Sequence, residues 1–279
     1  MRIALAQTNP VLGDLDTNLV AAKDAIAAAR AQHADVVIFP ELSLTGYAVG
    51  TVDVDLDLEA DDPRLLALAE LMGDGGVLFG FQEAGGVHSY NSAAYYEGGR
   101  LRHVHRKLYL PTWGLYEERK HFSPGQSMRA YDTRWGRMAT LICNDAWQPQ
   151  LPFVAVQDGA RAMFLPTNSS HSLDPRQWRA QAFWRDITRF HALLLTSYTV
   201  FVNRVGVEGS LHFWGGSHVV DPWGEVVAEA TEDEEALLVV DLDLAAVRRR
   251  RKEFPLVKEA RLALLEREIR RLADEGGDL

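Results

Sequence analysis

Three residues of this sequence carry side chains that could together attack an amide carbonyl, although they lie far apart in the chain. Cys143 closes the apolar run 138–143, Glu41 follows directly on the apolar run 35–40, and Lys107 ends a third predicted strand. Such an attack needs a thiolate, a base that removes the thiol proton, and positive charge where the oxyanion develops. The sequence therefore supplies a thiol, a carboxylate and an ammonium group at three predicted strand ends.

Taken singly, each residue has an ordinary structural explanation. A lone cysteine is most often a buried core thiol, a glutamate after a strand is usually exposed, and a lysine at a strand end is usually a solvated edge charge. Their shared position changes this interpretation, because the carboxyl ends of strands in an open α/β sheet face the ligand crevice. We expect Glu41 to take the thiol proton and later to activate water. We expect Lys107 to stabilise the tetrahedral intermediate and to help lower the pKa of the thiol.

The elements that must position these residues alternate between apolar runs and helical patterns. The runs 2–7 and 35–40 predict buried strands on either side of an Ala-rich helix over 18–32, with Asp14 or Asp16 as its N-cap. This order predicts parallel pairing through a crossover helix. Further along we expect a helix that Gly73 ends and three strands joined by hairpins at glycine pairs, which tolerate positive φ. These expected elements are the helix 63–72, the strands 76–82, 92–97 and 101–105, and the glycine pairs 85–86 and 98–99.

The second half of the chain repeats this alternation after an irregular segment over 108–127, a length that is often functional. The expected strands are 137–143, 162–166, 197–203, 217–221, 225–230 and 236–241, and the expected helices are 151–158 and 175–195. No linker rich in Pro, Gly or Ser separates the halves. We therefore predict one α/β domain with internal pseudo-symmetry over residues 1–243. A charged helical arm over 244–279 should follow it and pack on the domain or on a partner.

Composition argues against several classes of protein. The 279 residues carry a formal net charge of −10, which disfavours general binding to nucleic acid or to anionic membranes. Because the chain lacks both a long apolar stretch and a signal-peptide pattern, we expect no membrane association and a cytoplasmic location. The single cysteine excludes an intrachain disulfide and a Cys-rich zinc site. His103 and His105 share one strand face, but no metal-binding spacing accompanies them, so we predict no metal site.

Three short motifs resemble those of the nitrilase superfamily, the carbon–nitrogen hydrolases, in their order and rough spacing. They are Phe39-Pro40-Glu41, Arg106-Lys107 with the following Leu-Tyr-Leu-Pro, and Ile142-Cys143-Asn144-Asp145. Each motif is short, but further family-like segments, such as 202–206 and 221–225, extend the resemblance over most of residues 1–241.

The resemblance implies a four-layer α-β-β-α sandwich that forms a homodimer or a higher homo-oligomer. It also implies a Glu-Lys-Cys triad that works without a metal or an organic cofactor. In that triad Glu41 is the base, Lys107 the oxyanion stabiliser and Cys143 the nucleophile. The family's second glutamate, which positions the lysine and the substrate amide, falls on Glu118. The backbone N–H of Asn144 would be the other oxyanion donor.

The residues after Cys143 indicate the substrate class. True nitrilases of the family usually continue with Trp-Glu, whereas Asn144-Asp145 is similar to the amidase and N-carbamoyl-amino-acid hydrolase branches. The order through Trp147 also resembles the glutaminase domains of NAD synthetases, but this chain shows no phosphate loop of their ATP-dependent domain. We expect a hydrolase of a small linear amide or N-carbamoyl compound. Glutaminase-type ammonia release, a nitrilase, and a scaffold or binding protein with a vestigial site are the alternatives.

Candidate substrate-binding residues lie in the loops beside these motifs. Four aromatic residues could wall a small cavity or simply pack the loops: Tyr47, Trp113, Tyr116 and Trp147. Asn168 follows the predicted strand 162–166 and could hydrogen-bond the substrate. His171 and Arg176 come next, and either could meet a substrate carboxylate, although an exposed ion pair is the commoner use.

Overall fold

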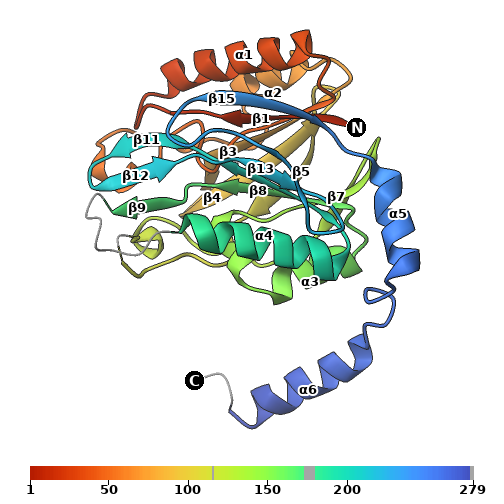
Figure 1. The fold of residues 1–279 in the computed structure, drawn as a ribbon. Coiled ribbons are helices and arrows are strands. Elements are labelled where there is room, and N and C mark those ends of the chain that lie inside the picture. The colour runs from red at the N-terminus through yellow and green to blue at the C-terminus, as the bar shows by residue number, and fades with distance from the viewer. Residues whose placement is uncertain (115, 173–179, 277–279) are drawn as a thin grey trace.

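The computed structural model describes residues 1–114, 116–172 and 180–276. Two six-stranded sheets pack face to face, and helices cover their outer faces (Figure 1). The first sheet has the strand order β15-β1-β2-β3-β4-β5, and the second has the order β14-β13-β10-β8-β7-β6. This arrangement is the predicted four-layer α-β-β-α sandwich.

The first sheet combines a parallel centre with antiparallel hairpins. Its strands are β1 (Arg2–Gln7), β2 (Val36–Ile38), β3 (Gly76–Gly85), β4 (His88–Glu97), β5 (Arg100–Arg106) and β15 (Ala236–Asp241). β1, β2 and β3 are parallel, as the strand–helix–strand order predicts. The hairpin between β4 and β5 turns at Gly98 and Gly99, whose φ angles of +61° and +69° are open to glycine at little cost.

The second sheet repeats this plan. Its strands are β6 (Ala130–Thr133), β7 (Gly136–Thr140), β8 (Ala162–Thr167), β10 (Tyr198–Asn203), β13 (His218–Val220) and β14 (Val226–Glu229). The central strands β7, β8 and β10 are parallel, and their outer neighbours are antiparallel. Each sheet thus has three central parallel strands, which agrees with the pseudo-symmetry expected from the sequence.

Three apolar layers hold the sandwich together. The layer between the sheets contains Leu5 of the first sheet and Phe164 of the second, both fully buried. The first sheet is covered by two helices, α1 (Leu15–Ala31) and α2 (Pro63–Glu70), and Asp14 is the N-cap of α1. The second is covered by α3 (Gln150–Gln157) and α4 (Gln181–Leu195), where Trp184 is buried. Both sheets are therefore buried on both faces, as the continuous apolar strands require.

Four short strands were not expected from the sequence. β6 was not predicted, nor was the small third sheet of β9 (Ser170–Ser172), β11 (Val205–Glu208) and β12 (Leu211–Trp214). Strands of three or four residues are too short for an alternating pattern to stand out. The predicted helix 175–195 appears as α4 from Gln181, and residues 173–179 lie outside the described part of the chain.

The C-terminal arm is two helices rather than one. α5 (Leu244–Glu253) ends before Pro255, and α6 (Leu262–Asp274) begins beyond it, because proline lacks the N–H of a helix interior and disfavours helix before it. Val247 of α5 reaches the core between the sheets, whereas no residue of α6 is buried and the helix stands away from the body (Figure 1). Like the other described helices, α6 lacks the length and apolarity to cross a membrane. The domain boundary at residue 243 stays a prediction.

Candidate active site

The three chemically suited residues lie just beyond strand ends. Glu41 follows β2, and Lys107 follows β5 directly. The prediction that a strand runs to Cys143 is wrong, because β7 ends at Thr140 and Cys143 begins the 3₁₀ helix η3 (Cys143–Trp147). Cys143 adopts a left-handed backbone with φ of +47°, a conformation that non-glycine residues rarely adopt. The nucleophile candidate is therefore presented on a sharp turn.

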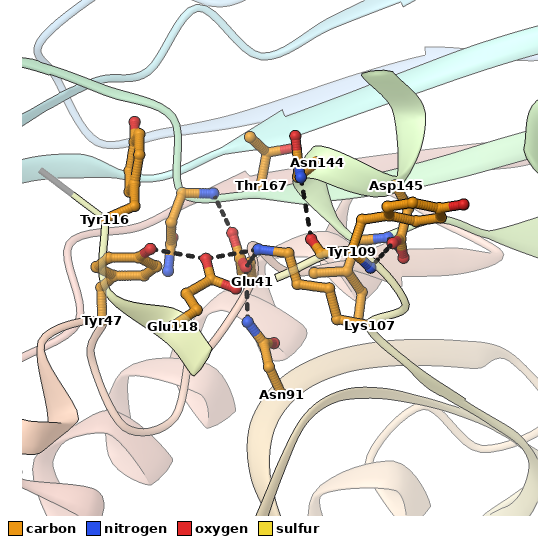
Figure 2. A network of polar contacts seen from close by, with 12 residues as sticks. Glu41, Tyr47, Asn91, Lys107, Tyr109, Tyr116, Glu118, Asn144, Asp145 and Thr167 are labelled. Carbon is orange, nitrogen blue, oxygen red and sulfur yellow. Dashed lines mark hydrogen bonds and ion pairs between the residues drawn. The ribbon is translucent and has the colours of Figure 1, made fainter. Parts of the chain in front are cut away.

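The centre of the site is a lysine between two carboxylates. The Nζ of Lys107 donates to Oε1 of Glu41 at 2.6 Å and to Oε1 of Glu118 at 2.7 Å (Figure 2). Lys107 is fully buried, and Glu41 and Glu118 are only 1% and 4% exposed. Glu118 begins the short 3₁₀ helix η2 (Glu118–Lys120), inside the segment predicted to be irregular. Buried charges of this kind persist only where partners and hydrogen bonds compensate for the lost water.

Two neutral donors complete this cluster. The side-chain amide of Asn91 donates to Oε1 of Glu41 at 2.7 Å, and the hydroxyl of Tyr47 donates to Oε1 of Glu118 at 2.7 Å (Figure 2). Sequence reasoning did not find Asn91, because a single asparagine within β4 carries no local signal. Both carboxylates are thus held in place from two sides.

The backbone of Asn168 connects the thiol to this cluster. Its N–H donates to Oε2 of Glu41 at 2.7 Å, and the backbone of Asn168 also lowers the pKa of the Cys143 thiol. Cys143 is partly exposed and lines a pocket. Residues from five separate segments therefore converge at one place.

The surroundings keep the thiol protonated at rest. Burial raises the pKa of Cys143 well above its ordinary value, and the nearby Glu41 carboxylate raises it further. Lys107 lowers the thiol pKa, as expected from the sequence, but this effect is outweighed. The proton must therefore leave as the sulfur attacks, which requires an adjacent base.

The pKa values of Glu118 and Lys107 depend on each other's charge. Burial and the charge of Glu41 raise the pKa of Glu118 to about 7, although Lys107 lowers it. Burial by itself would lower the pKa of Lys107, but Glu118 and Glu41 together raise it well above its ordinary value. The lysine consequently stays positive throughout the physiological pH range.

A pocket of about 340 Å³ opens over the thiol. Of the aromatic residues chosen from the sequence, Trp113, Tyr116 and Trp147 line it, and Trp184 joins them. Tyr47 does not line this pocket but an adjacent cavity of about 500 Å³ that shares Glu118. The pocket is thus small and largely aromatic, which suits a small organic substrate.

The two asparagines chosen from the sequence differ in their contacts. The side chain of Asn144 donates to the carbonyl of Tyr109 at 3.1 Å, while its backbone N–H lies in the first turn of η3, where helices leave amide donors without intrahelical partners. The side-chain amide of Asn168 is 1% exposed, and both of its polar atoms lack a partner among the described residues. An unpaired buried amide is costly, but Asn168 lines neither of the two pockets.

The remaining polar candidates have other contacts. The ring of His171 packs against His212, with 4.6 Å between centroids, and Arg176 lies outside the described residues. His103 stacks on Tyr131, and His105 hydrogen-bonds Asp145. Within the described ranges, no three His, Cys, Asp or Glu side chains gather in a way that could hold a metal.

A buried ion pair that sequence reasoning missed supports Tyr47. Arg204 is fully buried and pairs with Glu208, which accepts hydrogen bonds from the backbone N–H groups of Tyr47 and Ala48 at 3.1 and 3.0 Å. Arg204 lies in a segment that resembled the family, but Glu208 had no signal of its own. The pair fixes the loop that carries the Tyr47 hydroxyl to Glu118.

The sandwich fold, with a buried Glu-Lys-Glu cluster beside a lone thiol, defines a hydrolase that acts on C–N bonds. The chain belongs to the carbon–nitrogen hydrolase family, whose model matches residues 2–252. The resemblance expected from the sequence is thereby confirmed.

Curated relatives and solved structures agree with this assignment. The chain is 33% identical over 247 residues to a glutamine-dependent NAD(+) synthetase of Thermotoga maritima, covering 88% of this chain but only 42% of that relative. It is 28% identical to an N-carbamoylputrescine amidase of Arabidopsis thaliana, covering 89% of this chain and 88% of the relative. The structure of an amidase from Nesterenkonia sp. AN1 superposes with a TM-score of 0.80 at 26% identity and covers 96% and 99% of the two chains. A mutant of the Nesterenkonia amidase carries the acetamide moiety of fluoroacetamide covalently on its active-site cysteine.

Proposed function

We propose that this hydrolase cleaves the C–N bond of a small linear carboxamide or N-carbamoyl compound through a thioester on Cys143. The observation that carries the proposal is that Lys107 binds both Glu41 and Glu118, and that Glu118 and Cys143 line the same pocket. A scaffold has no need for this costly arrangement of buried charges.

In the acylation step Glu41 accepts the thiol proton while the sulfur attacks the substrate carbonyl carbon. The oxyanion that forms is stabilised by the ammonium group of Lys107 and by the backbone N–H of Asn144. Glu41 then delivers the proton to the nitrogen, the C–N bond breaks, and ammonia or an amine leaves.

In the deacylation step water replaces the departed amine. Glu41 removes a proton from this water as it attacks the thioester carbonyl, and the collapse of the second tetrahedral intermediate returns the proton to sulfur. Glu118 keeps Lys107 in place through Oε1, and its Oε2 has no partner among the described residues. That oxygen is available to accept a hydrogen bond from the substrate amide N–H.

Glutaminase-type release of ammonia is the second candidate. It is supported by the 33% identity to the glutamine-dependent synthetase, of which this chain spans less than half the length. The N-carbamoyl alternative is supported by the Arabidopsis relative, which the chain matches over most of both lengths. The residues Asn-Asp after Cys143, in place of Trp-Glu, argue against nitrile hydrolysis, although a nitrilase of Pyrococcus abyssi is 30% identical over 257 residues.

A substrate panel with two product assays tests the proposal. Glutamine, other ω-amides, N-carbamoyl amines and amino acids, aliphatic amides and nitriles are incubated with the protein, and ammonia and carbon dioxide are measured. Cys143→Ala should abolish turnover of every substrate, since no other thiol exists in the chain. Turnover that survives in Cys143→Ala would refute the thioester route.

We also propose that the protein self-associates and that it is located in the cytoplasm. Large apolar side chains of α4 and α6 are exposed, including Phe190 at 53% and Ile269 at 64%. Large apolar side chains gathered on a helix face can form a protein interface. Light scattering that reports a monomer at micromolar concentration would contradict the homo-oligomer.

A further inference from the structure

Asp145 is a fully buried carboxylate that the catalytic steps above do not use. Its Oδ1 accepts hydrogen bonds from the backbone N–H groups of Leu108 and Tyr109, each at 3.0 Å (Figure 2). Its Oδ2 accepts from the N–H of Ile142 at 3.2 Å and contacts Nε2 of His105 at 2.8 Å. One carboxylate thus binds four donors, and hydrogen bonds to a charged acceptor are among the stronger ones in proteins.

These donors come from the two halves of the site. Leu108 and Tyr109 directly follow Lys107, on the loop that leaves the first sheet. Ile142 directly precedes Cys143, on the turn that leaves the second sheet. Asp145 therefore bridges the loop of the lysine to the turn of the thiol, across the junction between the sheets.

The same contacts stabilise the unusual backbone of the nucleophile. The N–H of Asp145 donates to the carbonyl of Ile142 at 3.0 Å, while the Asp145 carboxylate accepts the N–H of Ile142. This reciprocal pair closes the turn in which Cys143 takes its positive φ. A strained conformation persists only where its surroundings over-determine it, and these hydrogen bonds do so here.

His105 contacts the Asp145 carboxylate and so helps to orient it. It lies on β5 and is 1% exposed, and because an ionised carboxylate only accepts hydrogen bonds, Nε2 of His105 carries the proton of their contact. A glutamine side chain can present an N–H at a similar reach, whereas leucine cannot donate at all.

We propose that Asp145, oriented by His105, is a positioning residue that sets the geometry between Lys107 and Cys143. This inference rests on the proposed function for its kinetic readout. It makes a separate prediction about the thiol itself. Losing the bridge moves the thiol relative to the base and the ammonium group, so both turnover and alkylation of Cys143 should slow.

The first experiment compares Asp145→Asn with Glu83→Gln. Glu83 is a matched control because it is also a buried carboxylate with several hydrogen bonds. It accepts two hydrogen bonds of 2.8 Å from Arg106 and one of 2.6 Å from the Ser92 hydroxyl, and its carboxylate hydrogen-bonds none of the residues proposed to act in catalysis. We expect Asp145→Asn to lower kcat on the order of 100-fold, because small displacements of reacting groups have effects of this size. The rate of Cys143 alkylation by iodoacetamide, followed by mass spectrometry, should fall at least about 10-fold by the same argument. Glu83→Gln should leave both rates within about twofold of the parent, even if its melting temperature drops equally.

The second experiment uses His105, in case Asp145→Asn does not fold. His105→Leu should slow turnover and alkylation, and His105→Gln should restore most of both rates by supplying the missing donor. If folded Asp145→Asn or His105→Leu alkylates at the parental rate, or if glutamine and leucine at position 105 behave alike, the positioning role is overturned. A parent protein that alkylates readily but hydrolyses none of the substrate panel would instead refute the proposed function. In that case the alkylation rates of the Asp145 and His105 variants would still test the positioning role of Asp145.

Discussion

Acidic and basic side chains gather at two places in this protein, in the active site and along α6. In the site, Lys107 and its two glutamates are at most 4% exposed, and Glu41 lies 66 positions from Lys107 in the chain. On α6, Arg270 pairs with Glu266 one helical turn away at 2.8 Å, and both side chains are about 70% exposed. The residue types and the distances are alike, but the surroundings are opposite.

The difference shows that burial rather than contact distance decides what an ion pair does. Water screens the α6 pairs, which therefore contribute little to stability. In the site, burial raises the pKa of Glu118 to about 7 although Lys107 lowers it, and the two glutamates raise the pKa of Lys107 well above its ordinary value. The buried cluster can therefore place charges that water does not screen next to a reacting substrate.

The largest expected effect is that of Lys107→Met. Removing the ammonium group leaves two buried carboxylates without their cation and should destabilise the protein by about 3–5 kcal/mol. Loss of the oxyanion partner should also lower kcat by roughly 100-fold to 1000-fold. Urea denaturation and steady-state kinetics measure the two effects. Lys120→Met is the matched control, since Lys120 pairs with Glu117 at the surface, and equal losses in both variants would contradict the comparison.

Glu118→Gln should change the pH profile. Above pH 7 Glu118 is ionised and can accept the substrate N–H, so kcat/KM should fall as the pH drops through about 7. The variant should lose this acid limb along with much of its activity. Because the folded state holds the Glu118 proton up to higher pH than the unfolded state, this group makes stability fall as the pH rises from about 4.5 to 7. A parent profile that is flat between pH 6 and 8 would count against this role of Glu118.

Alkylation of Cys143 should respond to pH in a way that reports the buried charges. Since burial and Glu41 raise the thiol pKa well above its ordinary value, the iodoacetamide rate should still be rising at pH 9. Lys107→Met should move the profile to still higher pH, because the lysine lowers the thiol pKa. A plateau near neutral pH would mean that the thiolate is already formed at rest.

The smallest expected effect is that of Arg270→Ala. Exposed pairs one helical turn apart are worth about 0.3–0.5 kcal/mol, so the free energy of unfolding should change by no more than that. Activity should not change, because α6 stands away from the site (Figure 1). A loss of several kcal/mol would show that α6 is packed against something in solution, such as a second copy of the chain.

Much of the fold follows from local patterns. The strands β1 and β2, the helix between them with an N-cap at Asp14 or Asp16, and the glycine hairpins were expected from the sequence, because each pattern concerns near neighbours in the chain. β9, β11 and β12 were not expected, since they are short and form only where their loops meet. The predicted strand up to Cys143 was wrong for a related reason, because β7 ends at Thr140 and the Asp145 hydrogen bonds hold Ile142 at the start of a 3₁₀ helix.

By itself the sequence determined which side chains were available for chemistry and roughly where strands would leave them. Only the tertiary structure decided that Lys107 binds Glu41 across 66 positions and that Asn168 binds Glu41 across 127. It also decided that Asn91, which has no local signal, and Asp145, which the sequence offered only as part of a motif, hold that chemistry in place. The physical reason is that periodicity and capping depend on residues a few positions apart, whereas contacts and burial in the site depend on how two whole sheets pack.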